Sequence, residues 1–315
     1  KEKERGKQMQ NLIEGLNDKQ KEAVLATEGP CLVIAGAGSG KTKVLTHKIA
    51  YLISEKGVKP YNILAITFTN KAASEMKQRV EKLVGDVAQE MWMGTFHSIC
   101  VRILRRFIDR IGFDTSFLIF DTSDQKTVVK ECLKALNIDD KTFSDRSVLS
   151  EISNAKNEML TPKAYQAKYS GEFRKEKIGQ VYELYQKRLR ENNAIDFDDI
   201  INYTIDILSE NPDVLQYYTE KFKYVLVDEY QDTNKAQFTL VTILASRYGN
   251  ITVVGDNDQG IYSFRGADIS NILNFEKDFP GTKIIKLEQN YRCTGNILKA
   301  ANAVIKKQNP QIKKQ

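Results

Sequence analysis

The chain has 315 residues, enough for two ordinary domains, and its 41% hydrophobic and 28% charged residues are typical of a globular protein. Its 47 basic and 41 acidic residues give a net charge of +6, a mild excess that is compatible with a polyanionic partner but is weak evidence for one. There is no apolar run of membrane-spanning length, and the four dispersed cysteines and two histidines lack the spacing of a zinc site, so we expect a cytoplasmic protein with reduced thiols and no membrane partner.

The first predicted element is a helix that runs toward Leu25, with Asn17 or Asp18 as its cap. Gln20 lies in its first turn, and a glutamine amide can both donate to and accept from an adenine edge. An ordinary surface glutamine remains the alternative for this residue.

A short apolar run over residues 31–35 predicts a buried strand, and apolar residues recur at helical spacing over residues 45–53. Between them lies a glycine-rich segment that ends in Lys41-Thr42. In such a loop the backbone N–H groups surround a phosphate chain, the lysine approaches the β- and γ-phosphates, and the threonine hydroxyl binds Mg²⁺. The candidate nucleotide-binding residues are Ala35 (where the strict pattern has glycine), Gly36, Ala37, Gly38, Ser39, Gly40, Lys41 and Thr42. The alternative is a glycine-rich turn with a solvated lysine.

A second buried strand is predicted over residues 63–68, followed by a polar turn and a helix through residues 76–84. Phe68 and Asn70 lie at the carboxyl end of this strand, where ligands bind in parallel sheets. They can stack on and hydrogen-bond to a nucleic acid, or serve as a buried phenylalanine and a helix cap.

A third strand is predicted near residues 91–94, and a helix opens at residues 95–98. His97 at its start is interpreted as a backbone contact or a cap-region polar residue. It is not expected to be a catalytic base, because no nucleophile accompanies it. Residues 112–193 alternate short helical patterns with polar turns and carry many lysines, which predicts a helical insertion whose basic face contacts a phosphate backbone or is solvated. The run from Asp196 to Asp199 is predicted to cap a further helix.

The apolar run at residues 224–227 predicts a strand that ends in adjacent acids, Asp228 and Glu229. In a phosphate-loop enzyme the first acid holds Mg²⁺ and the second orients and deprotonates the attacking water, although a chance acidic turn is the alternative. Further strands are predicted at residues 251–255 and 284–287, which makes the fold class α/β with a central parallel sheet.

After the strand at residues 251–255, Gln259 lies at the same sheet edge and can sense the γ-phosphate. Tyr262, Phe264 and Arg265 follow, a combination suited to base stacking worth ~1–3 kcal/mol per base. A hydrophobic plug with a structural arginine is the alternative.

The motifs AGAGSGKT, TFTNKAA, GTFHS, DFDD, VDEYQDTN, GDNDQGIYSFRGAD and QNYR occur in this order over about residues 16–305. The ordered set resembles the superfamily 1A DNA helicases of the PcrA, UvrD and Rep type. The resemblance implies a RecA-like phosphate-loop NTPase with a helical insertion domain, using ATP and Mg²⁺.

The resemblance also implies individual roles. Gln20 would read adenine, Lys43 would contact the nucleotide where the family usually has arginine, and Gln259 would couple the γ-phosphate to DNA. Tyr291 would stack on adenine and Arg292 would contact the γ-phosphate. The implied catalytic residues are Lys41, Asp228, Glu229, Gln259 and Arg292, with Thr42 and Asp228 as metal ligands. The implied DNA-binding residues are Phe68, Asn70, His97, Phe197, Tyr262, Phe264 and Arg265.

The expected organisation is a RecA-like domain over residues 11–110 and 194–282, an insertion over 111–193, and the start of a second RecA-like domain at 283–315. The expected function is that of an ATP-dependent 3′→5′ helicase and single-strand translocase in DNA repair or replication, present as its N-terminal half. Expected partners are single-stranded DNA and single-strand/duplex junctions, with repair proteins or RNA polymerase as candidates. A motor subunit of an ATP-dependent nuclease and a non-motor binding module remain alternatives.

Overall fold

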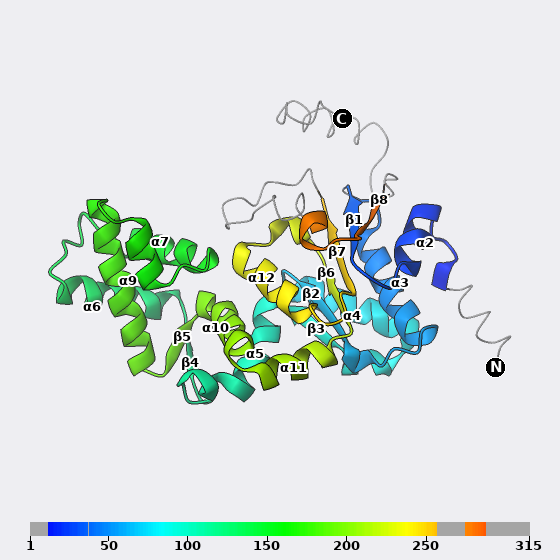
Figure 1. The fold of residues 1–315 in the computed structure, drawn as a ribbon, viewed down its shortest axis with the longest axis horizontal. Helices are drawn as coiled ribbons and strands as arrows, with labels where there is room; N and C mark the ends of the chain where they lie inside the picture. Colours follow the sequence, from blue (N-terminus) through cyan, green and yellow to red (C-terminus); the bar gives the residue numbers. More distant parts are fainter. Residues whose placement is uncertain (1–11, 37, 257–274, 288–315) are drawn as a thin grey trace, which may run out of the picture. The chain divides into compact units, whose positions relative to one another are not determined.

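The computed structural model describes residues 12–36, 38–256 and 275–287, and the chain divides into two compact units (Figure 1). The first unit comprises residues 1–95, 219–233 and 245–315, and the second comprises residues 96–218 and 234–244. A separate cluster of buried apolar side chains lies in each unit. Each unit therefore has the hydrophobic core that a domain requires.

The first unit contains one sheet of six strands in the order β3-β2-β6-β7-β1-β8, and every pair of neighbours is parallel. Its helices and strands are α2 (Asp18–Leu25), β1 (Cys31–Ala35), α3 (Lys41–Ser54), β2 (Ile63–Thr67), α4 (Asn70–Val84), β3 (Trp92–Thr95), β6 (Tyr224–Val227), β7 (Ile251–Gly255) and β8 (Lys283–Leu287), with short 3-10 turns at Pro60–Asn62, Asp86–Glu90 and Tyr230–Asp232. Because all strands run the same way, their carboxyl ends share one edge of the sheet. The predicted α/β fold with a central parallel sheet is confirmed.

The strands form where the sequence has uninterrupted apolar runs. All five residues of β2 and of β7 are buried, as expected for strands covered on both faces. β7 lies between β1 and β6 in the sheet, so one strand separates the phosphate loop from the acid pair. This arrangement is consistent with a RecA-like domain.

The edge strand β8 differs from the sequence expectation. Residues 283–287 were expected to begin a second RecA-like domain, but they pair in parallel with β1 along its whole length. Their apolar positions Ile285 and Leu287 are buried in the first core, while Lys283 and Lys286 are exposed. Lysines on an outer strand oppose further edge-to-edge pairing.

The second unit is mainly helical, with a short parallel pair of strands. Its elements are α5 (Phe96–Phe107), a 3-10 turn at Ile108–Ile111, β4 (Leu118–Phe120), α6 (Thr122–Ala135), α7 (Asp145–Asn157), α8 (Pro162–Lys168), α9 (Phe173–Glu191), β5 (Ala194–Asp196), α10 (Phe197–Glu210), α11 (Pro212–Lys221, which runs across the boundary at residue 218) and α12 (Lys235–Leu244). This unit is larger than the insertion expected at residues 111–193, because α5, α10 and α12 pack in it. Within the described ranges, no helix has both the length and the apolar character needed to cross a membrane.

Candidate functional site

The phosphate loop joins β1 to α3, and two of its glycines adopt left-handed backbone conformations. The φ angle is +74° at Gly38 and +87° at Gly40, a region that residues with side chains rarely adopt. A Cβ atom at Gly40 would also lie 2.5 Å from Nε2 of Gln20. The hydroxyl of Ser39 donates to the carbonyl of Gly36 over 2.7 Å and closes the loop. The left-handed backbone therefore favours glycine at residue 40, and a side chain there would also have to displace the amide of Gln20.

The amino end of α3 is open to an anion. Gly40 is its N-cap residue and forms no side-chain cap hydrogen bond. The first N–H groups of a helix have no intrahelical partner and lie at the positive end of its dipole, which suits a phosphate. Lys41 and Thr42 are the first two residues of α3, so they follow the loop directly, as the sequence predicted. Lys43 is exposed, and its Nζ donates to the carbonyl of Gly15 over 2.8 Å.

Gln20 is not a surface residue, because it is buried beneath the phosphate loop. Its backbone N–H and side-chain oxygen form a reciprocal capping box with Asn17, the N-cap of α2. Its amide nitrogen donates to the carbonyl of Ser39 over 3.1 Å. Gln20 thus ties α2 to the loop, and one amide hydrogen is left for the adenine contact that the resemblance implies.

The acid pair follows β6 at the same edge of the sheet. Asp228 is 7% exposed, and burial and the neighbouring charge of Glu229 raise the pKa of its carboxyl to about 6. Glu229 has φ +50° and ψ +44°, an unfavourable conformation for a residue with a side chain. Residues held in such conformations concentrate at functional sites, where surrounding contacts offset the strain.

An ion pair joins the two halves of the predicted site. Nζ of Lys41 lies 3.4 Å and 3.5 Å from the two carboxylate oxygens of Glu229, although 188 residues separate them in sequence. The side-chain nitrogen of Gln231 donates to Glu229 over 2.6 Å, and its oxygen accepts from the backbone N–H of Asp256 over 3.0 Å. Gln231 is buried and so connects the acid after β6 to the end of β7. Sequence analysis missed this residue, whose only signal is its place two residues after Glu229.

The donor set fits Mg²⁺ bound together with a nucleotide. The described residues contain no cluster of three histidine, cysteine or acidic side chains that forms a metal cage. Mg²⁺ usually binds through one or two carboxylates together with waters and substrate phosphates. The protein ligands that such an ion would use are the hydroxyl of Thr42 and the buried carboxylate of Asp228, which is repelled by the charge of Glu229.

In the first unit, Phe68 and Asn70 follow β2 at the edge where the loop and the acids lie. Phe68 is half-buried and Asn70 is exposed. The cap of α4 is Thr69, whose side chain accepts from the N–H of Ala72 over 3.1 Å. The side chain of Asn70 therefore does not serve as the cap, and its contact with DNA stays a prediction.

In the second unit, His97 and Phe197 form a stacked aromatic pair. Their ring centroids are 3.6 Å apart and their planes differ by 13°. Burial lowers the pKa of His97 to about 4, partly offset by a hydrogen bond with the backbone of Phe197, so the imidazole is neutral near pH 7. Phe197 is 55% exposed. An exposed aromatic ring held against a second ring offers a face for stacking a base.

The turn that carries Phe197 is held from within by an ion cluster that we call the lysine–aspartate brace: Lys156, Asp196 and Asp199. Nζ of Lys156 lies 2.6 Å from Asp196 and 2.9 Å from Asp199, and all three side chains are buried. Burial alone would lower the pKa of Lys156, but the two carboxylates hold it well above its usual value. Burial and the charge of Asp196 raise the pKa of Asp199 to about 7, because one ammonium serves two acids.

A pH dependence of stability follows from Asp199. Between its ordinary pKa of 3.8 and about 7, the folded protein holds a proton that the unfolded chain has released. Its stabilising contribution is therefore complete below about pH 4 and is lost as the pH rises through about 7. We expect Asp199→Asn to reduce the fall in the free energy of unfolding between pH 5 and pH 8, measured by urea unfolding.

Burial and the charge of Asp196 raise the pKa of Asp198 to about 6. Asp198 titrates in the same direction in the wild type and in Asp199→Asn, so the difference between the two proteins reports on Asp199. The exposed Asp140→Asn in the same unit is the control. An unchanged pH dependence in Asp199→Asn would contradict the assignment.

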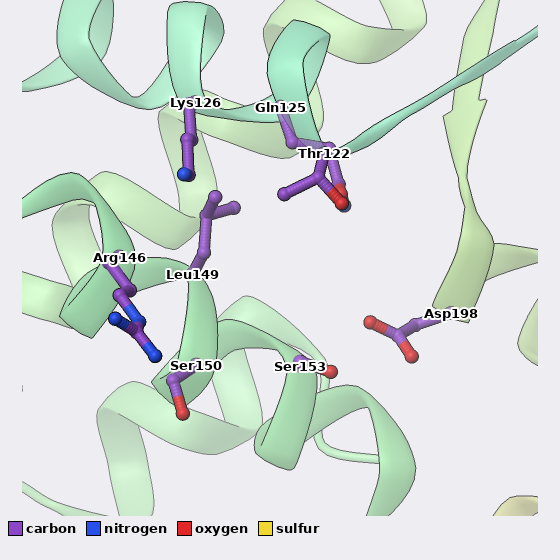
Figure 2. A pocket seen from close by; sticks show the side chains of 8 residues that line it. All are labelled: Thr122, Gln125, Lys126, Arg146, Leu149, Ser150, Ser153 and Asp198. Atoms are coloured by element: carbon purple, nitrogen blue, oxygen red, sulfur yellow. The ribbon is translucent and has the colours of Figure 1, made fainter.

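Asp198 also lines a cavity of about 250 Å³ (Figure 2). In the view of Figure 2 its carboxylate lies across the cavity from Lys126 and Arg146. The lining residues are Thr122, Gln125, Lys126, Arg146, Leu149, Ser150, Ser153 and Asp198. Two basic side chains and one acidic side chain therefore line this cavity.

Several predicted residues lie outside the described residues: Ala37, Gln259, Tyr262, Phe264, Arg265, Tyr291 and Arg292. Their proposed roles stay predictions. The described residues of the first unit contain the rest of the phosphate loop and the acid pair, and those of the second unit contain the His97–Phe197 pair.

A strand–loop–helix with an uncapped helix start, facing an acid pair that follows a parallel strand, defines a phosphate-loop nucleotide-binding protein. Residues 16–280 match the family model described as "UvrD/REP helicase N-terminal domain", and the chain belongs to this family. Two similar proteins are the ATP-dependent DNA helicases PcrA of Staphylococcus epidermidis and Staphylococcus aureus. Each is 59% identical over 298 residues, which is 95% of this chain and 41% of the relative. The chain thus spans less than half the length of these relatives.

Proposed function

We propose that this chain is the nucleotide-hydrolysing part of an ATP-dependent DNA helicase that moves 3′→5′ along single-stranded DNA in repair or replication in the cytoplasm. The observation that carries the proposal is the contact between Lys41 and Glu229, 188 residues apart. It brings the phosphate loop and the second acid together at one sheet edge. The names of the PcrA relatives and the family match support the same function.

In this proposal Lys41 and Glu229, which lie in contact, act on the same bound nucleotide. Lys41 exchanges Glu229 for the β- and γ-phosphates, since a phosphate chain carries more negative charge than one carboxylate. Glu229 then accepts the proton of the attacking water. The hydrogen bond from Gln231 orients the Glu229 carboxylate for this step. Thr42 and Asp228 would hold Mg²⁺, which would supply positive charge against the phosphates.

The DNA contacts of the proposal combine stacking with charge. A base stacks on Phe197, and the basic face of the second unit, which includes Lys126 and Arg146, contacts the phosphates. Stacking tolerates any base, and phosphate contacts carry no sequence information, so binding is independent of sequence and falls with salt. Candidate partners are single-strand/duplex junctions and, among proteins, repair factors or RNA polymerase.

The test uses the protein at its natural length. We expect ATP hydrolysis to be stimulated by single-stranded DNA, and a duplex with a 3′ single-stranded tail to be unwound while one with a 5′ tail is not. Hydrolysis indifferent to DNA would leave only a nucleotide-binding module. Shortening of the labelled strands during the same assay would favour the motor of a nuclease.

A further inference from the structure

The lysine–aspartate brace flanks Phe197 within a single helical turn. Asp196 precedes the ring and Asp199 follows it by two residues, and both residues are at most 2% exposed. Phe197 between them is 55% exposed. One turn of chain therefore has two anchored, inward side chains and one outward aromatic ring.

The anchors join this turn to two other helices. Lys156 comes from the last turn of α7 and contacts both carboxylates, at 2.6 Å and 2.9 Å. From α9, the hydroxyl of Tyr185 donates to Asp196 over 2.8 Å. Within the turn, Asp196 and Asp199 form a reciprocal capping box. Rotation of the turn about its axis would break these bonds and leave buried charges unpaired, which is strongly unfavourable.

The brace bears on binding because Phe197 is already stacked on His97. A ring that is held in its binding pose before a ligand arrives loses less conformational entropy when the ligand binds.

We propose that Lys156 is a positioning residue for single-stranded DNA: by bonding Asp196 and Asp199 on either side of Phe197, it fixes the first turn of α10 and presents the ring for stacking a base. This inference rests on the proposed DNA-binding function. Lys156 lies in α7 of the second unit, whereas the candidate nucleotide-binding residues lie in the first unit.

The test is a double-mutant cycle with the protein at its natural length. Lys156→Met with Asp196→Asn removes the ammonium and its main partner together, and asparagine remains a favourable N-cap. We expect Phe197→Ala to weaken binding of a fluorescent single-stranded oligonucleotide about tenfold, and the brace variant to weaken it roughly fivefold. Because the brace acts through the ring, combining all three substitutions should weaken binding no more than Phe197→Ala alone.

Two further readouts separate positioning from loss of structure. The affinity for a nucleotide should be unchanged, and so should the slope of log Kd against log salt, because no phosphate contact is removed. The control is the double variant Lys175→Met with Glu151→Gln. It removes an ion pair of 2.5 Å between α9 and α7 that does not contact the turn. This control should bind DNA as the wild type does.

The proposal would be overturned if the fold-losses in DNA affinity of the brace variant and of Phe197→Ala multiplied in the combined variant. It would also be overturned if the brace variant folded and bound DNA with wild-type affinity. If the brace variant does not fold, Tyr185→Phe provides the test, because it leaves the three brace residues in place and removes the hydroxyl that donates to Asp196 and accepts from Gln125. Tyr185→Phe should weaken DNA binding when Phe197 is present. It should have no further effect when it is combined with Phe197→Ala. If Phe197→Ala itself binds DNA normally, the proposed DNA platform fails rather than the brace.

Discussion

Glu229→Gln should bind ATP as tightly as the wild type or more tightly, and should hydrolyse it about 10²–10⁴ times more slowly. The amide has nearly the same shape as the carboxylate, and Asp228 is left in place as the Mg²⁺ ligand. What is lost is the basic oxygen that takes the proton of the attacking water. The substitution also frees Lys41 from its ion pair, and this is why binding should not weaken.

The measurement is single-turnover hydrolysis with the protein at its natural length, together with nucleotide affinity by fluorescence titration. The matched control is Glu90→Gln, an exposed acid just before β3 and hence at the opposite edge of the sheet. That variant should turn over normally. Hydrolysis by Glu229→Gln within about threefold of the wild-type rate would mean that another group activates the water.

The second large effect is expected for Lys41→Ala. Its side chain is 12% exposed, and the residue lies at the start of α3, where the loop is proposed to bind the phosphates. A hydrogen bond to a charged group contributes about 1.5–3 kcal/mol, so its loss should weaken ATP binding roughly ten- to hundredfold. At an ATP concentration of 100 times the wild-type Kd, binding stabilises the wild type by about 2.7 kcal/mol, but a hundredfold weaker variant by only ~0.4 kcal/mol.

The ATP-induced rise in Tm measures this difference directly. Lys41→Met, which keeps most of the aliphatic stem, should behave like Lys41→Ala, because the charge is what matters. Lys59→Ala removes an exposed lysine at the amino edge of the sheet and should keep the full rise. A wild-type rise in Lys41→Ala would show that the nucleotide does not bind at this loop.

Much of the fold was predictable because the signals are local. The buried strands β1, β2, β6 and β7 are continuous apolar runs, and their bounds differ from the prediction by at most one residue. Asp196 caps α10 through a side-chain contact three residues away, so its role could be inferred from neighbouring residues alone. The phosphate loop was recognisable for the same reason, since it requires glycines at fixed spacing before a lysine.

Sequence reasoning was less successful for residues that occupy an environment in which their residue type is rarely found. Lys156 resembles the solvated lysines around it, because lysines are almost always exposed unless they are paired. Its partners lie 40 and more residues away, and nothing local indicates them. Gln20 was expected at the surface or against adenine, yet its contact with Ser39 also makes it part of the loop's support.

The sequence by itself determined that this protein has a nucleotide-binding loop, an acid pair after a parallel strand, and the ordered motifs of its family, because each is a short run whose chemistry follows from its own residues. The tertiary structure alone decided that Lys41 pairs with Glu229, that Gln231 connects Glu229 to the end of β7, and that residues 283–287 join the first sheet. These contacts depend on the order in which strands are placed side by side. That order is set by the packing of the whole core, which no single stretch of the chain encodes.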